Sequence, residues 1–401
     1  MENAEKKKII WVVIASVVCI LEFFAYRYLE DKLDFGHKSI TVGLVVDGDE
    51  STPYSENFIR VMDTMKAEFG DDIDILIRCN VPYEEVEEVL RELADNDCDI
   101  IFTNSYGYGE TVKKVAVEYP WVQFCQATCD NANTDMVSNY HTFMGEIYQG
   151  RYVAGQIAGL KLTELIEKGD IIPEEAWIGY VGAYPYPEVI SGYTAFFLGA
   201  RQTCPSVRMR VKYTGTWTSY MKEKELAGEL IDEGCIIISQ HSDTIGPAVM
   251  CESANAGHPV FHVGYNQDMI DVAPTTSLIS TRINWTPYIR EAIKATMNDR
   301  KIEEVVHGNV HGNDVGAGFD RNWVEMLELN PAIAPEGGAE LIKRSVEDMK
   351  NGRIHVFRGD YTGYNPSDPS DMWDLNNEFI ENAESSAPTF RYVLRDVIII
   401  E

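Results

Sequence analysis

The chain has 401 residues, too many for one ordinary hydrophobic core, so its length predicts two domains. Hydrophobic residues make up 45% of the chain and charged residues 24%, which is typical of a soluble globular protein. The formal net charge of −30 argues against a nucleic-acid partner, because such binders need a basic surface.

The N-terminus differs from the rest of the chain. Three lysines at 6–8 precede an apolar run at 9–20. A basic flank before an apolar segment is typical of a signal peptide or an N-terminal anchor. Residues 1–30 are therefore predicted to be a membrane anchor or signal segment, with a buried helix as the alternative. Cys19 follows Val18, where a lipoprotein signal needs a small residue, so an uncleaved anchor is favoured over a lipoprotein.

The eight cysteines do not form a recognisable metal or redox motif. Cys125 and Cys129 are four residues apart, and no CxxC pair is followed by a second pair, so a zinc site is not supported. Cys235 begins an apolar run at 235–238, which is typical of a buried thiol. We predict no structural disulfide and no metal site.

From residue 40 onward, short apolar runs alternate with amphipathic segments. Predicted strands lie at 40–47, 73–77, 99–104 and 121–126, with predicted helices at 58–69, 83–93 and 112–119. These strands are apolar on both faces. That pattern predicts a parallel sheet covered by helices.

The pattern then restarts with a long predicted helix at 145–160. Predicted strands follow at 177–182, 207–213, 235–239, 260–264 and 277–280, with predicted helices at 189–202, 222–232, 245–256 and 287–298. Two runs of β-α units predict an α/β protein with two doubly wound lobes. Neither run contains GxGxxG or GxxxxGK[ST], so a nucleotide-phosphate site is not expected.

In open α/β sheets a ligand binds beyond the carboxyl ends of the strands, which here is the cleft between the lobes. The residues at these ends are rich in aromatic, amide and carboxylate side chains and poor in Lys and Arg. The candidates for ligand binding are Tyr54, Asn104, Tyr106, Tyr184, Trp217, His241, Asp243, Asn266 and Asp268. Aromatic faces stack on planar ligands, and amides and carboxylates bind donor and acceptor edges. The pattern favours a neutral, planar, hydrogen-bonding solute.

Several candidates also have structural interpretations. Tyr54 follows a proline at a helix start and fits an exposed cap as well as a ligand contact. For His241 a structural role is favoured over metal binding, because no second ligand lies at a matching spacing. Asp243 fits a helix cap, a ligand contact or both. Asn104 pairs with either a turn or a ligand. Tyr184, together with Tyr186, is expected at the rim of a hinge rather than on the pocket floor.

Several stretches together resemble the basic membrane protein family of ABC-transporter substrate-binding proteins, which includes bacterial purine nucleoside receptors. The stretches are TFMGEIYQGRYVAGQIAG at 142–159, WIGYVGAYPYPEVISGYTAFFLGAR at 177–201, TWTSYMKEKELAGELIDEGCIIISQHSD at 216–243, VGYNQDM at 263–269 and the tail GDYTGYNPSDPSDMWDL. The resemblance covers residues 39–400. No single stretch is a strict motif, but their ordered set is specific.

The resemblance implies a type I periplasmic-binding fold with three crossings between the lobes, near Met144, Val272 and Gly312. Lobe 1 is then expected at 39–144 and 273–312, and lobe 2 at 145–272 and 313–401. The implied ligand is a purine, held between an aromatic residue of each lobe. The matching positions here are Tyr54 and Trp217. The family's acidic residue falls at Asn266 or Asp268, and a cation found in many members falls at Arg282.

The chain departs from the nucleoside-binding members in two loops. Its first loop reads DGDESTPYSEN where those members have a DDKSFNQ-like sequence, and their glycine-rich turn is replaced by residues 240–243. This resembles a subgroup that takes free bases such as adenine. The base-holding part of the site is therefore better supported than the ribose-holding part.

These observations predict an extracytoplasmic solute-binding protein, tethered at the plasma membrane. We expect it to be a monomer without a cofactor or catalytic residues that passes a purine base or nucleoside to an ABC permease. A ligand-sensing surface receptor of the same fold is an alternative. A nucleoside hydrolase is a weaker alternative, because Asp47, Asp49 and Glu50 only partly match the acidic calcium cluster of such enzymes.

Overall fold

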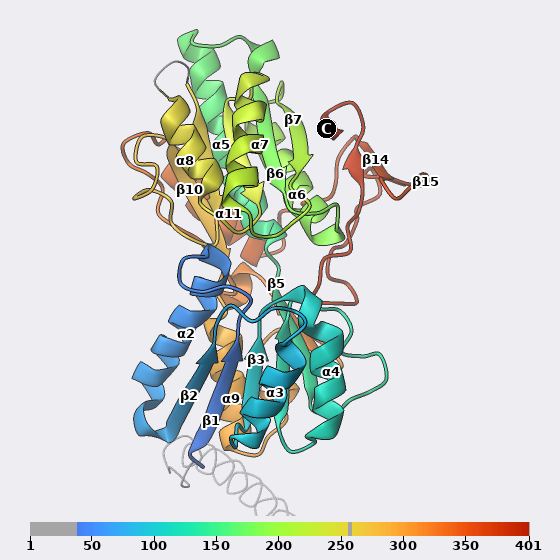
Figure 1. The fold of residues 1–401 in the computed structure, drawn as a ribbon. Coiled ribbons are helices and arrows are strands. Elements are labelled where there is room, and N and C mark those ends of the chain that lie inside the picture. Colours follow the sequence, from blue (N-terminus) through green and yellow to red (C-terminus); the bar gives the residue numbers. More distant parts are fainter. Residues whose placement is uncertain (1–37, 256–258, 401) are drawn as a thin grey trace, which may run out of the picture. The chain divides into compact units, whose positions relative to one another are not determined.

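The computed structural model describes residues 38–255 and 259–400. From Ile40 onward the chain forms one compact unit built on two large sheets (Figure 1). Both sheets are mostly parallel and carry helices, which confirms the predicted α/β class. The predicted N-terminal anchor, including Cys19, lies outside the described residues. Among the residues that are described, no helix is both long and apolar enough to cross a membrane.

The first sheet has seven strands and is parallel except at one edge. In spatial order they are β11 (Asn309–His311), β12 (Asp314–Ala317), β5 (Tyr140–Gly145), β4 (Gln123–Ala127), β3 (Ile100–Thr103), β1 (Ile40–Val45) and β2 (Ile73–Arg78), with β11 antiparallel to β12. Its helices are α2 (Pro53–Phe69), α3 (Val86–Asp95), α4 (Gly109–Glu118), α9 (Thr286–Met297) and the short α10 (Ile302–Val305). The central strands β3 and β5 are fully buried. Strand β3 is one of the apolar runs that the sequence predicts, whereas β5 carries His141 and Thr142 and was not predicted as a strand.

The second sheet also has seven strands. Their order is β13 (Val324–Met326), β10 (Ser277–Ile283), β9 (Phe261–Tyr265), β8 (Ile237–His241), β6 (Trp177–Gly182), β7 (Arg208–Tyr213) and β17 (Ile398–Ile400), with β13 antiparallel to β10. Its helices are α5 (Tyr148–Lys168), α6 (Pro187–Thr203), α7 (Tyr220–Asp232), α8 (Gly246–Ala254) and α11 (Gly338–Lys350). We call each sheet with its helices a lobe.

Two of the predicted lobe boundaries need correction. The chain first leaves the first sheet after Gly145, next to the predicted crossing at Met144. Strand β10 pairs with β9 and β13, so the second crossing follows Ile283 and not Val272. Strand β12 pairs with β5, so the third crossing follows Ala317 and not Gly312. The apolar pattern of a strand identifies it as a strand, but only its pairing decides which sheet it joins.

The three crossings lie side by side. A Cβ added to Gly145 would lie 2.6 Å from Cγ2 of Ile283 and 3.0 Å from the carbonyl oxygen of Trp323. The backbone nitrogen of Glu146 donates to the carbonyl oxygen of Ala317 at 2.8 Å. A glycine at position 145 is therefore what allows the crossing strands to approach one another.

Helices α5 and α6 pack backbone against backbone. A Cβ on Gly155 would lie 2.0 Å from the carbonyl oxygen of Phe196, and one on Gly199 would lie 2.0 Å from that of Tyr152. The glycine in each helix removes the side chain that would separate them. This packing matters for the site, because α5 carries Arg151 and α6 carries Glu188.

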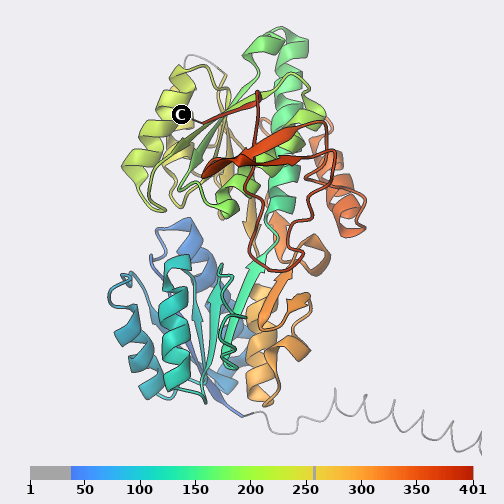
Figure 2. The ribbon, with the colours of Figure 1, turned by 90° about the vertical axis from the view of Figure 1, so that its right-hand side faces the viewer.

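The tail that follows α11 forms a separate three-stranded sheet. Its strands are β14 (Thr362–Asn365), β15 (Asp368–Asp374) and β16 (Val393–Leu394). Between β15 and β16 a long irregular segment leaves this sheet and returns to it (Figure 2). The chain then ends in β17, which pairs in parallel with β7.

Candidate functional site

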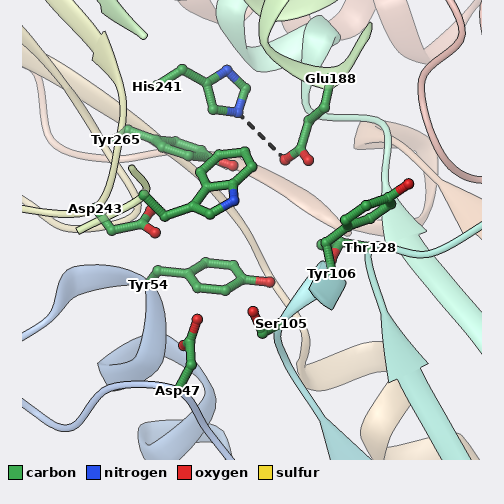
Figure 3. Close-up of a pocket in the computed structure, with 10 residues that line it drawn as sticks. Asp47, Tyr54, Ser105, Tyr106, Thr128, Glu188, His241, Asp243 and Tyr265 are labelled. Atoms are coloured by element: carbon green, nitrogen blue, oxygen red, sulfur yellow. Dashed lines mark ion pairs between the residues drawn. The ribbon is translucent and has the colours of Figure 1, made fainter. Parts of the chain in front are cut away.

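A pocket lies where the carboxyl ends of strands from both lobes meet. Its lining residues follow β1, β3 and β4 of the first sheet, and end or follow β6, β7, β8 and β9 of the second. They are Asp47, Tyr54, Ser105, Tyr106, Thr128, Glu188, Trp217, His241, Asp243 and Tyr265 (Figure 3). The pocket encloses about 360 Å³ of space, part of it open to solvent. This is the position that the doubly wound topology predicts.

The first-lobe side of the pocket is held by Asn104. Its amide nitrogen donates to Oδ1 of Asp47 at 3.0 Å, and its amide oxygen accepts from the backbone nitrogen of Asp47 at 3.1 Å. Its carbonyl oxygen accepts the Tyr54 hydroxyl proton at 2.6 Å. Asn104 is fully buried and does not line the pocket. It orients a carboxylate and an aromatic ring that do.

On the second-lobe side, the loops after β7 and β8 are tied together. The backbone nitrogen of Asp243 donates to the carbonyl oxygen of Trp217 at 3.0 Å. The buried carboxylate of Glu223 accepts from the Ser242 hydroxyl at 2.8 Å and from the backbone nitrogen of Thr244 at 3.1 Å. These bonds hold Trp217 and Asp243 at fixed positions beside the pocket.

Three carboxyl groups line the pocket, and burial changes the charge of one of them. Burial raises the pKa of Asp243 well above its usual value, and the negative charges of Asp47, Glu223 and Glu188 raise it further. The shift favours a neutral carboxyl that can donate one hydrogen bond and accept others. No Lys or Arg lines the pocket in the described chain, and its polar wall is made of acids, hydroxyls and His241.

His241 is fully buried, and its Nε2 lies 3.4 Å from Oε1 of Glu188 (Figure 3). Burial and, to a smaller extent, the positive charge of Arg151 lower the pKa of His241 to about 4, against the opposing effect of Glu188. The ring is therefore neutral near pH 7. Within residues 38–255 and 259–400, no group of His, Cys, Asp and Glu side chains could hold a metal ion.

Behind the pocket wall, Arg151 stacks on Tyr265. The guanidinium carbon lies 3.8 Å from the ring centroid, and Arg151 is fully buried. Its three side-chain nitrogens have no hydrogen-bond partner in the described part of the chain. A buried cation without partners is costly, so its contact with the ring of Tyr265 is the clear favourable interaction at this position.

The predicted site residues fall into two groups. Tyr54, Tyr106, Trp217, His241 and Asp243 line the pocket, and Asn104 lies directly behind it. Tyr184 lies outside the lining set. Its ring stacks on Tyr186, with centroids 5.0 Å apart, and meets Trp217 edge to face at 5.8 Å. The expected place of Tyr184 and Tyr186 at the rim of a hinge stays a prediction.

The three predicted residues at the ends of β9 and β10 lie outside the pocket. Arg282 forms an ion pair with Glu325 at 2.9 Å. Asp268 is exposed, and its carboxylate accepts from the backbone nitrogen of Ile270 at 2.9 Å. Asn266 is buried in a left-handed conformation with φ of 66°. The geometry gives Arg282 and Asp268 structural partners in place of the ligand contacts that the resemblance implied.

Five lining residues, Asp47, Ser105, Thr128, Glu188 and Tyr265, were not among the predicted ligand-binding residues. Thr128 follows β4, so the strand-end rule could have found it. Glu188 opens α6 after the Tyr-Pro-Tyr-Pro stretch and offered no signal of its own. Arg151 lies in the middle of an apolar helix, and its stacking on Tyr265 depends on the packing of α5 against the second sheet.

The thiols do not contribute to the pocket. In the described part of the chain, Cys79, Cys98, Cys125, Cys129, Cys204 and Cys251 are free thiols. Cys125 and Cys129 are both buried, and burial raises the pKa of each thiol above its usual value. Reactive thiolate chemistry is therefore disfavoured at these two positions.

Comparisons with known proteins agree with this architecture. The family model of PnrA-like ABC transporter substrate-binding proteins matches residues 40–349. A protein of Brucella abortus named as purine-binding is 30% identical over 72% of this chain and 75% of its own length. A Haloferax volcanii protein, named as a putative ABC transporter glucose-binding protein, is 28% identical over 76% of this chain and 70% of its own.

Solved structures give the same fold at lower identity. An ABC transporter solute-binding protein of Aeropyrum pernix K1 aligns with a TM-score of 0.63 and 18% identity, over 79% of this chain and 92% of that one. The predicted type I periplasmic-binding fold is thereby confirmed. The match to the family model covers well over half of the chain. This chain belongs to the family of PnrA-like ABC transporter substrate-binding proteins.

Proposed function

We propose that the protein captures a purine base or nucleoside in the inter-lobe pocket and delivers it to an ABC permease. The observation that carries the proposal is the pocket itself. It combines aromatic rings from both lobes with three carboxyl groups, and none of the described lysines or arginines lines it. The 30% identical relative that is named as purine-binding supports the same ligand class.

The aromatic residues suit a flat ligand. Tyr54 comes from the first lobe and Trp217 from the second, and both line the same pocket. Stacking a base on an aromatic side chain contributes about 1–3 kcal/mol per base. Movement of the lobes about the three crossings would bring the two rings onto opposite faces of one planar ligand, a hinge motion known from related architectures.

The polar wall suits the edge of a purine. Carboxylates at Asp47 and Glu188 accept hydrogen bonds from ring and amino N–H groups. A neutral Asp243 can donate to a ring nitrogen and accept from an N–H. A phosphate group would meet these acids without a compensating cation, so nucleotides should bind much more weakly than bases or nucleosides.

The cellular role follows from the family. Substrate-binding proteins of ABC systems act outside the cytoplasm and pass small ligands to permeases, so we infer the same partner here. Tethering by residues 1–30 and a monomeric state belong to this proposal. We infer that the pocket binds its ligand without turnover. In the alternative, sensory role, the closed form is presented to a membrane partner. Stimulation of a reconstituted permease by ligand-loaded protein would favour transport over this role.

A neutral monosaccharide is the second candidate ligand. The 28% identical Haloferax relative is named as a putative glucose-binding protein, and aromatic rings beside carboxylates also suit sugar hydroxyls. Titration calorimetry of the full chain with adenine, hypoxanthine, adenosine, inosine and D-glucose separates the two. Binding of a purine with no heat from glucose supports the proposal. Binding of glucose alone overturns it, and release of free base from adenosine would identify an enzyme.

A further inference from the structure

The irregular segment between β15 and β16 connects the two lobes. It leaves the three-stranded tail sheet and returns to it as the long loop visible in Figure 2. Residues 381–389 form its far end and contact both lobes, and we call them the strap. The strap lies beyond residue 349, where the match to the family model ends. It joins the lobes in addition to the three crossings of the chain.

Hydrogen bonds within the strap give it a fixed shape. The side-chain amide of Asn382 donates to the carbonyl oxygens of Ser385 at 3.0 Å and Ser386 at 2.7 Å. The backbone nitrogen of Thr389 donates to the carboxylate of Glu381 at 2.6 Å and closes the strap at its base, in the manner of an Ω-loop. A loop tied in this way acts as a strut between its two anchors and not as a slack linker.

The anchor on the second lobe is built into a hydrophobic core. The buried carboxylate of Glu381 accepts from the Ser191 hydroxyl of α6 at 2.7 Å. Phe390, directly after the strap, is fully buried and stacks on Phe357, with ring centroids 4.3 Å apart. Both rings belong to the core of the second lobe. Detachment at this end would expose large apolar side chains to water, which is costly.

The anchor on the first lobe is smaller and mainly polar. Ser386 donates to the buried carboxylate of Asp314 in β12 through its hydroxyl at 2.5 Å and its backbone nitrogen at 2.6 Å. A Cβ on Gly316 would lie 3.0 Å from Cβ of Ser386, so the strap packs directly on this strand. Ala387 adds one methyl group to the hydrophobic cluster of the first lobe. Two hydrogen bonds and a methyl group are easier to separate than stacked core rings, so the strap should detach at this end.

We propose that the strap is a latch between the lobes. While Ser386 is bound to Asp314, the strap holds the lobes at the separation seen in the structure. When this contact breaks, the strap stays with the second lobe, and the lobes rotate apart about the three crossings. The latch thus biases the equilibrium between lobe arrangements on which a ligand also acts. The inference goes beyond the proposed function and holds whichever ligand the pocket takes.

The distance between the lobes provides the test. Spin labels would be attached through Glu88→Cys in α3 and Glu225→Cys in α7, because both positions are exposed and lie on different lobes. Cys19 and the exposed Cys79 would be replaced by serine to avoid labelling there. Pulsed electron spin resonance on the full chain in detergent, without added ligand, then gives the distribution of label distances.

Two variants weaken the anchor on the first lobe. Ser386→Ala should raise the ratio of long to short label distances about 3- to 10-fold, as expected for the loss of one hydrogen bond. Ala387→Asp should raise it further, because the variant places a charge against the apolar cluster of the first lobe. Glu384→Ala is the matched control, because Glu384 is an exposed residue of the same strap. It should leave the distances unchanged.

The latch is overturned if Ser386→Ala and Ala387→Asp both keep the label distances of the unmodified protein. A lower melting temperature with unchanged distances has the same meaning, because the strap then contributes to stability alone. The latch is also overturned if Glu384→Ala lengthens the distances as much as Ser386→Ala, since the effect would not depend on the contact with Asp314. These measurements contain no ligand, so their failure leaves the proposed function standing.

Discussion

Arg151 and Tyr265 form a stacked pair, with the guanidinium carbon 3.8 Å from the centroid of the ring. Tyr265 lines the ligand pocket, whereas Arg151 lies behind it without a hydrogen-bond partner for any side-chain nitrogen among the described residues. A buried cation in this state lowers the stability of the fold. Its presence beside the pocket suggests that it supports the pocket wall at the expense of stability.

Arg151→Met should separate these two effects. The apo melting temperature should stay constant or rise, because an apolar side chain of similar volume replaces an unpaired buried charge. Ligand affinity should fall about 2- to 10-fold, because Tyr265 loses a cation–π contact worth about 0.5–1.4 kcal/mol. Calorimetry and melting curves measure both. Lys161→Met in the same helix is the control, because Lys161 lies over Phe261 and away from the pocket. A large loss of apo stability with unchanged affinity would contradict a supporting role for Arg151.

The same variant should alter a neighbouring histidine. The charge of Arg151 is one cause of the lowered pKa of His241, so its removal should raise that pKa from about 4 toward its usual value. Titration of the histidine resonances by nuclear magnetic resonance measures this directly. An unchanged pKa of His241 would show that burial alone accounts for the shift.

Trp217→Ala should weaken purine binding roughly 5- to 150-fold, because stacking of a base on an aromatic ring contributes about 1–3 kcal/mol. Trp217→Phe should retain much of the affinity, since it keeps an aromatic face. Trp217 is partly exposed, so neither change should lower the apo melting temperature strongly. Calorimetry on both variants, with apo melting curves, is the measurement. Equal affinities for Trp217→Ala and the unmodified protein would remove Trp217 from the site.

Glu146 makes stability depend on pH at the first crossing. Burial raises its pKa to about 7, although Asn309 donates to its carboxylate at 2.8 Å. Between pH 4.5 and 7 the folded state holds a proton that the unfolded state releases, so this contribution to stability falls as pH rises through that window. Glu146→Gln stays neutral and should be more stable than the unmodified protein at pH 8, by up to about 3 kcal/mol.

The measurement is urea denaturation of both proteins from pH 4 to pH 8.5. The difference in the free energy of unfolding should be small at pH 4 and should grow through pH 7. Glu336→Gln is the control, because Glu336 is exposed. A difference that does not change with pH would show that Glu146 titrates normally in the folded protein.

Gly155→Ala should destabilise the fold strongly, because the added Cβ would lie 2.0 Å from a backbone oxygen of α6. Overpacking of this kind costs about 1–3 kcal/mol or more. Gly228→Ala in α7 is a matched control, because its Cβ would meet Met250 at an ordinary 3.4 Å. That change should stabilise the protein by about 0.5–1 kcal/mol, as alanine favours a helix interior. Thermal melts of both variants check the pair, and equal effects would contradict the close helix contact.

Much of the site could be predicted from strand ends alone. Parallel strands bring their carboxyl ends to one edge of a sheet, so the residues that follow each apolar run become neighbours regardless of their separation in sequence. This is why Tyr54, Trp217, His241 and Asp243 were found without a structure. Asp268 and Arg282 also lie at strand ends, but local partners, a turn for one and Glu325 for the other, occupy their side chains.

The sequence by itself determined the α/β class and most of the strands whose ends meet at the pocket, because periodicity is a local property of the chain. Only the tertiary structure decided the sheet that each late strand joins, since β10 and β12 look alike as strands and differ only in their partners. It also decided the positions of Arg151, Glu188 and the segment 381–389 between β15 and β16. Their roles arise from packing between segments far apart in the chain, such as Ser386 with Asp314, which no local pattern records.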